Sequence, residues 1–562
     1  MKVLGNVLLA AALAVAVGWP ALATTLEVMG LRGAESGTVP SAGPIGPLPF
    51  TDTTLARPLA LARNTLELVL ATEAVALPAG IALAVLLVRT DMAGRRPLLA
   101  SLALAVFIPL PLHATAWLGA FGNQGRVQLF TTKPILVGLP GAAFVQGMAA
   151  LPWVTLLVGV GLRGVEPELE EAAVLDWPAW RVVLGVSLRR SVGAIAGAAL
   201  AVAVLTAGDM TVTDLLRVRT FAEEAYLQAN LKLGNGPEAV AVVALPPLVV
   251  LGTLVLLAAR ALLRADPARL PSPRSRARTW RLGRWRFGVG AVVVAIVGNA
   301  VALPIYGLIW RAGWVGRLGG KRWTWPTFRK SIGASWEDLA PNVSQLLRHP
   351  SWYWQSPLLN SLIWSAAGAT ATLLVAWPLA WKARRPGAWA WVAAGVVALL
   401  LATPGPAAGL ALVLAYRSVP IVYNTPVVLV LVDILRTLPY AMLVLWPALR
   451  TFPEDYLEAA ALDGLSPGSI VRRIVIPLTR APALAAWGVA FALAMGELPA
   501  YSVVELPGTE TATKLVWSLL HTGVESRLSG IALILLAVVG AAGLPAAWAL
   551  RRVYGTGQAE IS

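Results

Sequence analysis

The side chains that most often perform chemistry in proteins are scarce in this sequence of 562 residues. It contains no cysteine, which excludes disulfides, thiolate metal sites and cysteine nucleophiles. Its three histidines, His113, His349 and His521, are far apart and form no local metal-binding pattern. No G-x-x-x-x-G-K-[ST] segment is present, so we expect no ATP hydrolysis by this chain. We therefore expect a protein that is not an enzyme, and we assign it no catalytic residue, metal ligand or cofactor.

One polar stretch stands out in this apolar sequence: "EAAALDGLSPGSIVRRIVIP", residues 458–477. Its alanines and leucine favour a short helix, which Gly464 closes in the left-handed conformation. Ser466-Pro467 is then an N-cap with proline in the first turn, and it starts a second helix. Pro477 predicts a bend into the next apolar segment. We expect two short helices at about a right angle, the first narrow enough to enter a groove on a partner protein.

The same stretch has a counterpart earlier in the chain. "LPWVTLLVGVGLRGVEPELEEAAVLD" (151–176) aligns without gaps with "LPYAMLVLWPALRTFPEDYLEAAALD" (438–463), an offset of 287 residues. Self-similarity at a separation of half the chain indicates two copies of one unit. Six apolar segments separate the copies, so both face the same side of a membrane and the repeat is parallel. The matched residues are Glu171 with Glu458, Ala172 with Ala459, Ala173 with Ala460, and Asp176 with Asp463.

The amino-acid composition indicates that these units fold in a membrane. The chain is 57% hydrophobic and 13% charged, whereas soluble domains carry roughly 25% charged residues. Segments of roughly 20 apolar residues are long enough to span a bilayer as helices. We therefore predict an all-α membrane protein with about twelve transmembrane helices in two tandem domains. The expected segments are 3–23, 65–88, 98–120, 135–162, 191–209, 238–260, 287–310, 357–381, 388–415, 425–449, 481–500 and 528–550.

The distribution of basic residues predicts the orientation. The net charge of +16 lies in short runs between apolar segments, which indicates membrane topology and not nucleic-acid binding. The basic loops near residues 89–96, 260–286, 382–385 and 551–552 all fall on one face, which we assign to the cytoplasm together with both termini. The loop 311–356 is also basic but falls outside. Its tryptophans predict a folded outer segment.

The domain limits follow from the segments and the repeat. The first apolar segment fits either a cleaved signal peptide or a retained span, and we favour the span. The predicted divisions are 1–60 (helix and outer segment), 61–262 (first transmembrane domain), 263–286 (arginine-rich cytoplasmic linker), 287–356 (helix and outer loop), 357–552 (second transmembrane domain) and 553–562 (tail).

The pattern E-A-A, three residues, G, nine residues, I-x-x-P resembles the EAA motif of binding-protein-dependent ABC importer permeases. The family positions are occupied by Glu458, Ala459, Ala460, Gly464, Ile474 and Pro477, with Ile476 where leucine is usual. The first copy keeps Glu171, Ala172 and Ala173, but Trp177 replaces the glycine and the closing proline is missing. The resemblance implies that each copy forms a coupling helix that docks into an ATPase subunit.

Two further stretches, 208–226 and 496–526, resemble the corresponding parts of permeases for iron(III) in which two permease domains are fused. The resemblance implies a permease subunit of the inner membrane that imports iron(III). Its partners would be a dimer of ABC ATPase subunits, which uses the ATP, and an extracytoplasmic substrate-binding protein. The alternatives are permeases for thiamine, sulfate, molybdate or polyamines, and a secondary transporter with two parallel six-helix halves.

Charged residues near or inside the apolar segments are the remaining candidates, because such charges are costly and often functional. Asp209 and Glu497 each follow a glycine after the corresponding span of each half. They either line the translocation path and attract a hard cation, which prefers oxygen ligands, or are hydrated residues at the membrane edge. Asp433 and Arg436 are spaced for an ion pair along one helix.

Overall fold

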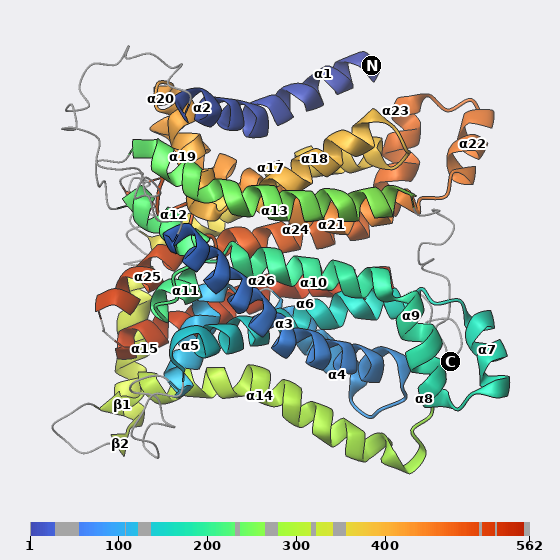
Figure 1. Cartoon of the computed structure of the whole chain (residues 1–562), viewed down its shortest axis with the longest axis horizontal. Coiled ribbons are helices and arrows are strands. Elements are labelled where there is room, and N and C mark those ends of the chain that lie inside the picture. Colours follow the sequence, from blue (N-terminus) through green and yellow to red (C-terminus); the bar gives the residue numbers. More distant parts are fainter. Residues whose placement is uncertain are drawn as a thin grey trace.

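Helices make up nearly all of the described part of the chain in the computed structural model. The structure describes residues 2–28, 56–106, 108–121, 136–230, 236–264, 279–315, 322–340, 356–504, 508–522 and 525–555. Most of the arginine-rich linker and parts of the outer loop and the tail lie outside these residues. The long helices lie side by side, with α7 and α22 projecting together from one end of the molecule (Figure 1).

The helices of the two halves follow one another in the same order. The first half comprises α1 (Lys2–Leu13), η1 (Ala14–Gly18), α2 (Trp19–Val28), α3 (Ala56–Arg89), α4 (Arg95–Ala105), α5 (Leu110–Phe121), α6 (Gly138–Arg163), α7 (Pro167–Asp176), α8 (Ala179–Val182), η3 (Val183–Ser187), α9 (Leu188–Arg190), α10 (Val192–Ala207), α11 (Thr211–Leu215), α12 (Phe221–Asn230) and α13 (Gly236–Arg264). The second comprises η5 (Gly283–Trp285), α14 (Arg286–Ala312), β1 (Trp314–Val315), β2 (Arg322–Trp323), α15 (Trp325–Leu339), α17 (Pro357–Ala383), α18 (Ala388–Ala402), α19 (Gly405–Tyr416), α20 (Pro420–Tyr423), α21 (Val427–Arg450), α22 (Asp455–Leu462), α23 (Pro467–Ile470), η7 (Val471–Val475), α24 (Ile476–Met495), α25 (Ala512–Thr522) and α26 (Glu525–Gly555).

The apolar helices confirm an all-α membrane protein. Among the described residues, eight helices are long and apolar enough to cross a membrane, and the number rises to 11 if each of three bent pairs is one span. The pairs α4–α5 and α18–α19 are bent by 110° and 109° at the same place in each half, as a structural repeat requires. A shorter apolar helix, Ser526–Ala541, corresponds to the twelfth expected segment.

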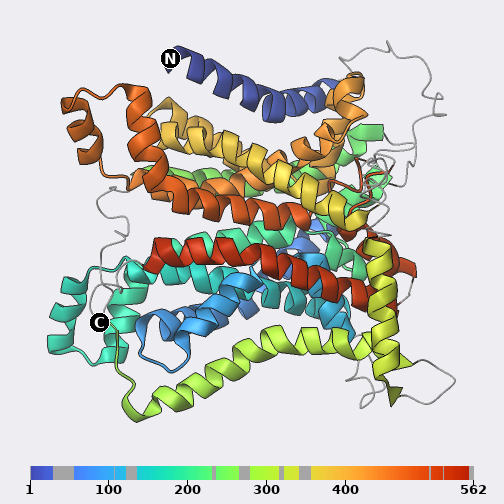
Figure 2. The same cartoon turned by 180° about the vertical axis from the view of Figure 1, so that it is seen from behind.

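The first helix of each half packs on the opposite half. Trp19 of α2 donates to the carbonyl oxygen of Ala415 at 3.0 Å, and Tyr416 donates to that of Val15 at 2.6 Å. In the second half, α14 lies against α5, where a Cβ on Gly307 would meet the backbone of Ala120 at 2.8 Å. Figure 2 shows these two helices at opposite edges of the bundle. That the first span is retained stays a prediction.

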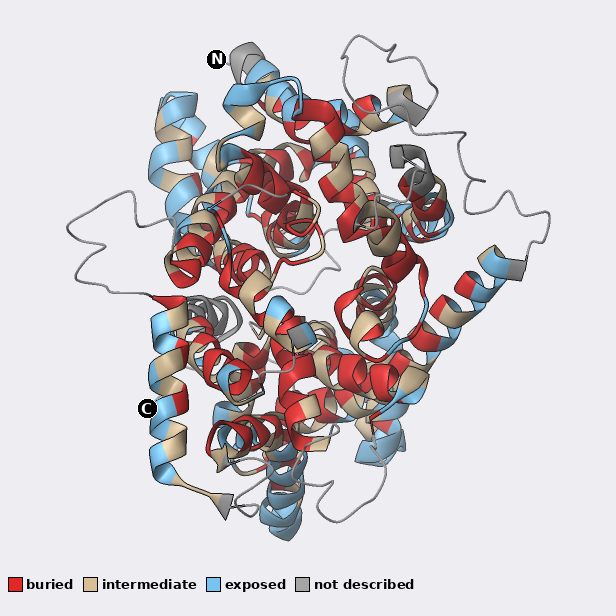
Figure 3. Ribbon diagram, turned by 90° about the vertical axis from the view of Figure 1, so that its left-hand side faces the viewer, coloured by how far each residue is buried: buried red, intermediate tan, exposed pale blue. Residues whose placement is uncertain are grey.

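Burial is concentrated between the helices, as Figure 3 shows in a view along them from the end opposite α7 and α22. Large apolar side chains are exposed on the periphery, among them Leu59, Leu66, Val249, Leu257 and Leu374, which are 46% or more exposed. Such a surface would be a liability in water but is the surface expected against lipid tails.

The described part of the loop 311–356 is folded, as its tryptophans predicted. The β1 and β2 strands pair antiparallel, with Trp314 opposite Trp323. Helix α15 lies across the end of the bundle that is opposite α7 and α22 (Figure 1). The hydroxyl of Ser331 donates to the carbonyl oxygen of Ser526, and that of Ser335 to Arg527, at 2.7 and 2.9 Å. These bonds fasten α15 to the start of α26.

One local prediction was wrong. Pro477 does not bend the chain: α23, η7 and α24 form a single span over residues Pro467–Met495. The wider π-helical turn of η7 ends at Val475, two residues before Pro477, and proline has no N–H for the regular helical hydrogen bond. The corresponding bend occurs in the first half, by 65° at Ser191, although that copy has no proline there.

Candidate functional site: two projecting helices and a central contact line

The second projecting helix, α22, forms as its sequence predicts. Gly464 has a φ of +77°, and its N–H bonds to the carbonyl oxygen of Ala461 at 3.1 Å. A side chain at this φ would be strained, which explains the need for glycine at this turn. Ser466 then caps α23 by accepting the N–H of Ser469 at 3.4 Å, and Pro467 opens the helix. Ile474 is half-buried in η7, and Pro477 is exposed.

The first projecting helix, α7, ends differently. The chain leaves α7 at Trp177 in an extended conformation (φ −124°), not in a left-handed turn. The Trp177 ring packs against Gly185, where an added Cβ would meet the ring at 3.1 Å. The missing glycine is therefore replaced by an indole that holds the chain against η3, and the exit geometry differs between the two copies.

The two helices present matching exposed faces. Glu171, Ala172 and Asp176 are exposed on α7, and Ala173 is partly exposed. On α22 and the turn after it, Glu458, Ala459, Asp463 and Gly464 are exposed, whereas Ala460 is buried.

An apolar residue completes each face. Leu175 and Leu462 are 85% and 89% exposed, and they correspond in the 287-residue alignment. We had not singled out these leucines from the sequence, although the alignment contained the signal. An exposed leucine beside a glutamate and alanines makes an apolar-centred contact surface with a polar edge.

A buried ion pair anchors α7. Arg89, the last residue of α3, pairs with Glu170, and both side chains are fully buried. The hydroxyl of Ser187 in η3 also donates to Glu170 at 2.5 Å. The glutamate directly before the E-A-A triplet therefore faces inward, while Glu171 faces out. We had not identified Glu170 or Arg89 as anchors from the sequence.

The equivalent anchor of α22 is more exposed. Arg384 and Arg385, which follow α17, both contact Glu454 at the start of α22, at 3.3 and 2.5 Å. The hydrogen bond from Arg385 lowers the pKa of the Glu454 carboxyl group. Because Arg385 is 68% exposed, solvent screens this pair, and it holds α22 less firmly than the buried pair holds α7.

Asp209 and Glu497 occupy equivalent positions and are both buried. Asp209 accepts the N–H groups of Thr211 and Val212, at 2.9 and 3.0 Å, and a hydrogen bond from Gln146. Glu497 accepts the N–H of Ala500 at 2.9 Å. Each carboxylate thus caps the short turn after its span. Their place on a translocation path stays a prediction.

The expected ion pair between Asp433 and Arg436 is wrong. Arg436 donates to Glu497 at 3.1 Å and to the carbonyl oxygen of Thr403, whereas Asp433 accepts a hydrogen bond from Tyr501 at 2.8 Å. The i, i+3 spacing permitted a pair, but residues 61 and 68 positions away along the chain reached these side chains instead.

Equivalent aromatic residues of the two halves touch each other. Trp153 and Tyr440, which correspond in the repeat, have ring centroids 6.4 Å apart. Tyr226 and Trp517, each the sixth residue of its helix, are 6.1 Å apart edge to face, and the indole donates to the Tyr226 hydroxyl at 3.3 Å.

If a twofold rotation relates two residues, the midpoint between them lies on the rotation axis. These contacts therefore lie on the pseudo-twofold axis between the halves. Met210 and Leu498, which directly follow the capping carboxylates, are also fully buried in one cluster with Trp517.

Known proteins resemble the second half of the chain. Residues 368–554 match the model of the family "Binding-protein-dependent transport system inner membrane component". This part of the chain is therefore similar to a permease domain of that family. The matched range begins in α17 and ends in α26, and it contains α22. The repeat extends the same architecture to the first half, and the chain is a multi-pass inner-membrane protein.

Curated relatives match the chain over shorter stretches. The spermidine/putrescine transport system permease protein PotC of Escherichia coli is 31% identical over 99 residues, which are 18% of this chain and 38% of PotC. The putrescine transport system permease protein PotI of Escherichia coli is 29% identical over 113 residues, 20% and 40% of the two chains. PotC of Haemophilus influenzae is 28% identical over 108 residues, 19% and 42%. The match spans about two fifths of the length of these relatives.

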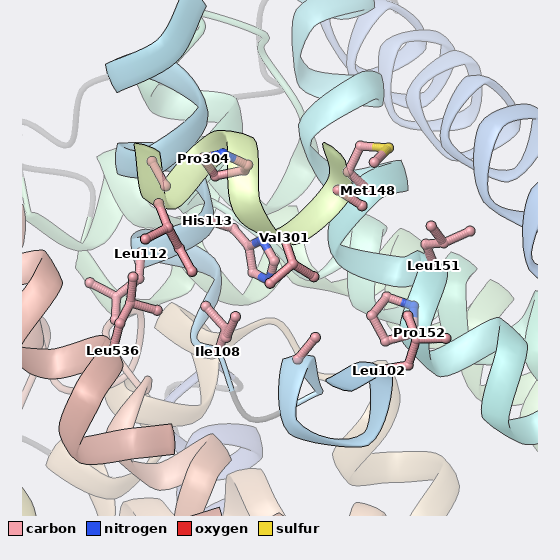
Figure 4. A pocket seen from close by; sticks show the side chains of 14 residues that line it. Leu102, Ile108, Leu112, His113, Met148, Leu151, Pro152, Val301, Pro304 and Leu536 are labelled. Atoms are coloured by element: carbon pink, nitrogen blue, oxygen red, sulfur yellow. The ribbon is translucent and has the colours of Figure 1, made fainter. Parts of the chain in front are cut away.

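The structure has a small, mostly apolar cavity beside the first half. His113 points into it from α5, among Ile108, Met148, Val301 and Pro304 (Figure 4). Its volume is about 20 Å³, enough for about one water molecule. The other residues that line the cavity are apolar and His113 has a hydrogen bond with the backbone of Ala105, so His113 fits a packed residue better than a ligand. The described residues contain no group of three or more histidines and carboxylates that could hold a metal ion.

Carboxylates gather at the end of the molecule opposite α7 and α22. Glu223 and Glu224 of α12, which is outside the candidate spans, are buried, and Glu224 pairs with Arg57. A second contact joins the two halves here: His521 of α25 contacts Asp214 of α11 at 3.1 Å. Burial raises the pKa of Glu223 to about 7, with Glu224 and Asp214 adding repulsion and Arg219 opposing the shift.

This raised pKa predicts a pH dependence of stability. The folded-state pKa of about 7 exceeds the ordinary value of 4.5, so the stability that Glu223 contributes is present below pH 4.5 and is lost as pH rises toward 7. We expect the Glu223→Gln variant to lose less stability than the parent across this range, by on the order of 1–3 kcal/mol. Thermal unfolding of both proteins in detergent at several pH values measures the difference. Parallel pH profiles would contradict the assignment.

Proposed function

We propose that this chain is the membrane-spanning subunit of an ABC importer, with two permease domains in one polypeptide. The observation that carries the proposal is the pair of equivalent helices, α7 and α22, which project from one end with matching exposed glutamates and leucines. A protein that worked alone would have no use for two such exposed apolar-centred surfaces.

In this proposal α7 and α22 are coupling helices, each docked in a groove of one ATPase subunit. The docking residues are Glu171, Ala172, Ala173 and Asp176 in the first copy, and Glu458, Ala459, Ala460, Asp463 and Gly464 in the second, with Ile474 and Pro477 positioning α22 from behind. The end that bears them is cytoplasmic, as are both termini. An extracytoplasmic binding protein delivers substrate to the opposite end, near α12 and α25.

The translocation path in this proposal follows the pseudo-twofold axis. Two halves that rock against each other separate along their axis, so the residues that meet there open and close the path. The contacts between Trp153 and Tyr440 and between Tyr226 and Trp517 close it at two levels. Asp209 and Glu497 cap the turns that lead to Met210 and Leu498, and in this proposal they line the path.

The substrate we favour is a polyamine or a similar organic cation. The curated relatives are permeases for spermidine and putrescine, and none of those reported above carries iron(III). The carboxylates Asp214, Glu223 and Glu224 lie at the outer end near aromatic rings, an environment that attracts ammonium groups and repels sulfate or molybdate. Iron(III), which the fused architecture suggested, has no support beyond that resemblance.

Uptake into proteoliposomes tests both parts of the proposal. The permease, its co-purifying ATPase and the binding protein are reconstituted with ATP inside, and labelled putrescine, spermidine and ferric citrate are offered outside. We expect ATP-dependent uptake of the polyamines at least about tenfold above that of ferric citrate, a difference that corresponds to roughly 1.4 kcal/mol. ATP-dependent uptake of iron alone would refute the polyamine assignment. Uptake by the permease without any ATPase would identify a secondary transporter.

A further inference from the structure

A polar clasp holds α12 to the outer end of α3. The side-chain amide of Asn64 donates to the carbonyl oxygen of Arg219 at 3.0 Å, two residues before α12 begins. The hydroxyl of the next residue, Thr65, accepts the N–H of Phe221, the first residue of α12, at 3.3 Å. One N–H that the helix start leaves unpaired is therefore satisfied from another helix.

The second half repeats this clasp atom for atom. Asn360 of α17 donates to the carbonyl oxygen of Glu510 at 3.1 Å, two residues before α25 begins. Ser361 accepts the N–H of Ala512, the first residue of α25, at 2.9 Å. In the sequence the clasp is only an Asn-Thr or Asn-Ser pair in the first nine or ten residues of a long apolar helix. It becomes recognisable once the two halves are compared in space.

The clasped helices are those that meet on the axis. Tyr226 is on α12 and Trp517 is on α25, and their contact joins the halves at the outer end. A displacement of the outer end of α3 or α17 therefore moves one side of this contact. The tie is short and directional, because each clasp combines a donor and an acceptor on adjacent residues.

The opposite ends of the same two helices hold the projecting helices. Arg89, which ends α3, pairs with Glu170 of α7, and Arg384, directly after α17, contacts Glu454 at the start of α22. Helix α3 has 34 residues and is about 50 Å long at ~1.5 Å per residue. One helix in each half thus joins the projecting helix at one end of the molecule to the axial contact at the other (Figure 1).

We propose that α3 and α17 are transmission helices, and that Asn64, Thr65, Asn360 and Ser361 are positioning residues through which movement of α7 and α22 opens the contact between Tyr226 and Trp517. This inference rests on the proposed function, because an ATPase must move the projecting helices. Helices with polar ties at both ends transmit a displacement that side-chain packing alone would absorb.

The native chain has no cysteine, so a reporter needs no prior removal of thiols. Tyr226→Cys and Trp517→Cys are introduced together, and the full chain is purified with its ATPase in nanodiscs. A short bifunctional maleimide measures crosslinking without nucleotide and after trapping with ATP and vanadate. In this parent we expect trapping to lower crosslinking about tenfold. With Asn64→Ala and Asn360→Ala added, we expect a fall of less than about twofold, with nucleotide trapping unchanged.

A second variant and a matched control keep the result interpretable. Thr65→Val with Ser361→Ala removes only the two hydroxyl acceptors, and we expect it to weaken the nucleotide response in the same direction. Arg63→Gln with Glu67→Gln removes an exposed ion pair within α3 that ties it to no other helix, and it should respond as the parent does.

Each outcome decides something different. If trapping with ATP and vanadate still lowered crosslinking tenfold in both clasp variants, the transmission role would be overturned. Loss of crosslinking already without nucleotide would show that the clasps only hold α12 and α25 in place, which also overturns it. If no ATPase co-purifies, or if the parent itself shows no nucleotide response, the proposed function fails and the inference fails with it.

Discussion

Reversing one charge on α22, in the Glu458→Lys variant, is expected to uncouple the permease from its ATPase. Glu458 is exposed, and it lies on the face that also presents Leu462, which is 89% exposed. A central interface residue of this kind contributes about 2 kcal/mol or more to binding, so we expect association at least about 30-fold weaker. Co-purification of the ATPase and ATP-dependent uptake should both fall to background.

The control for Glu458→Lys is Glu337→Lys, the same charge change on an exposed residue of α15 at the opposite end. Substitutions at such exposed positions usually change stability by less than about 0.5 kcal/mol, so both variants should fold. Normal ATPase association in the Glu458→Lys protein would rule out α22 as the docking helix. ATPase association measured for Glu171→Lys then tests whether α7 also docks, although the chain leaves it at Trp177 in a different conformation.

Removing the buried arginine beneath α7, in the Arg89→Ala variant, is expected to destabilise the whole first half. Arg89 and Glu170 are both fully buried, and the substitution leaves the glutamate without its counter-charge. Breaking one partner of a buried pair costs about 3–5 kcal/mol, a large part of the stability of a typical domain. We expect poor accumulation in the membrane and a clearly lower unfolding temperature in detergent.

Two further variants separate the causes of this loss. Arg89→Met combined with Glu170→Leu replaces the pair by apolar groups of similar size and should recover most of the stability, within about 2 kcal/mol of the parent. Arg385→Ala removes a more exposed pair at the equivalent place in the second half and should cost about 0–1 kcal/mol. If Arg89→Ala unfolded at the parental temperature, the buried pair would not anchor α7.

The transmission inference connects these two predictions. Glu458 and Leu462 lie on the exposed face of α22, where an ATPase can bind and displace the helix. Arg89 and Arg384 connect the projecting helices to α3 and α17, so they transmit this displacement. The stronger anchor belongs to the copy with the degenerate motif, α7, whereas α22 keeps the full motif on a more exposed anchor. We therefore expect the two halves to contribute unequally, with Glu458→Lys more damaging than Glu171→Lys in the same uptake measurement.

The sequence by itself determined the class of the protein and the local shape of α22. Apolar segments of about 20 residues allow few structures other than spanning helices. Gly464, Ser466 and Pro467 act through their own backbone preferences, so the turn after α22 could be predicted without knowledge of its neighbours. The repeat was legible because the two copies share residues at a fixed offset of 287.

Only the tertiary structure decided which polar side chains meet. Arg436 binds Glu497 and not Asp433, Glu170 turns inward to Arg89, and Tyr226 reaches Trp517 across 291 residues. The span after α22 continues straight through Pro477, while its counterpart bends at Ser191. The physical reason is the same in each case. A partner is chosen by the distance between side chains after the helices have packed, and spacing along one helix shows only which contacts are permitted.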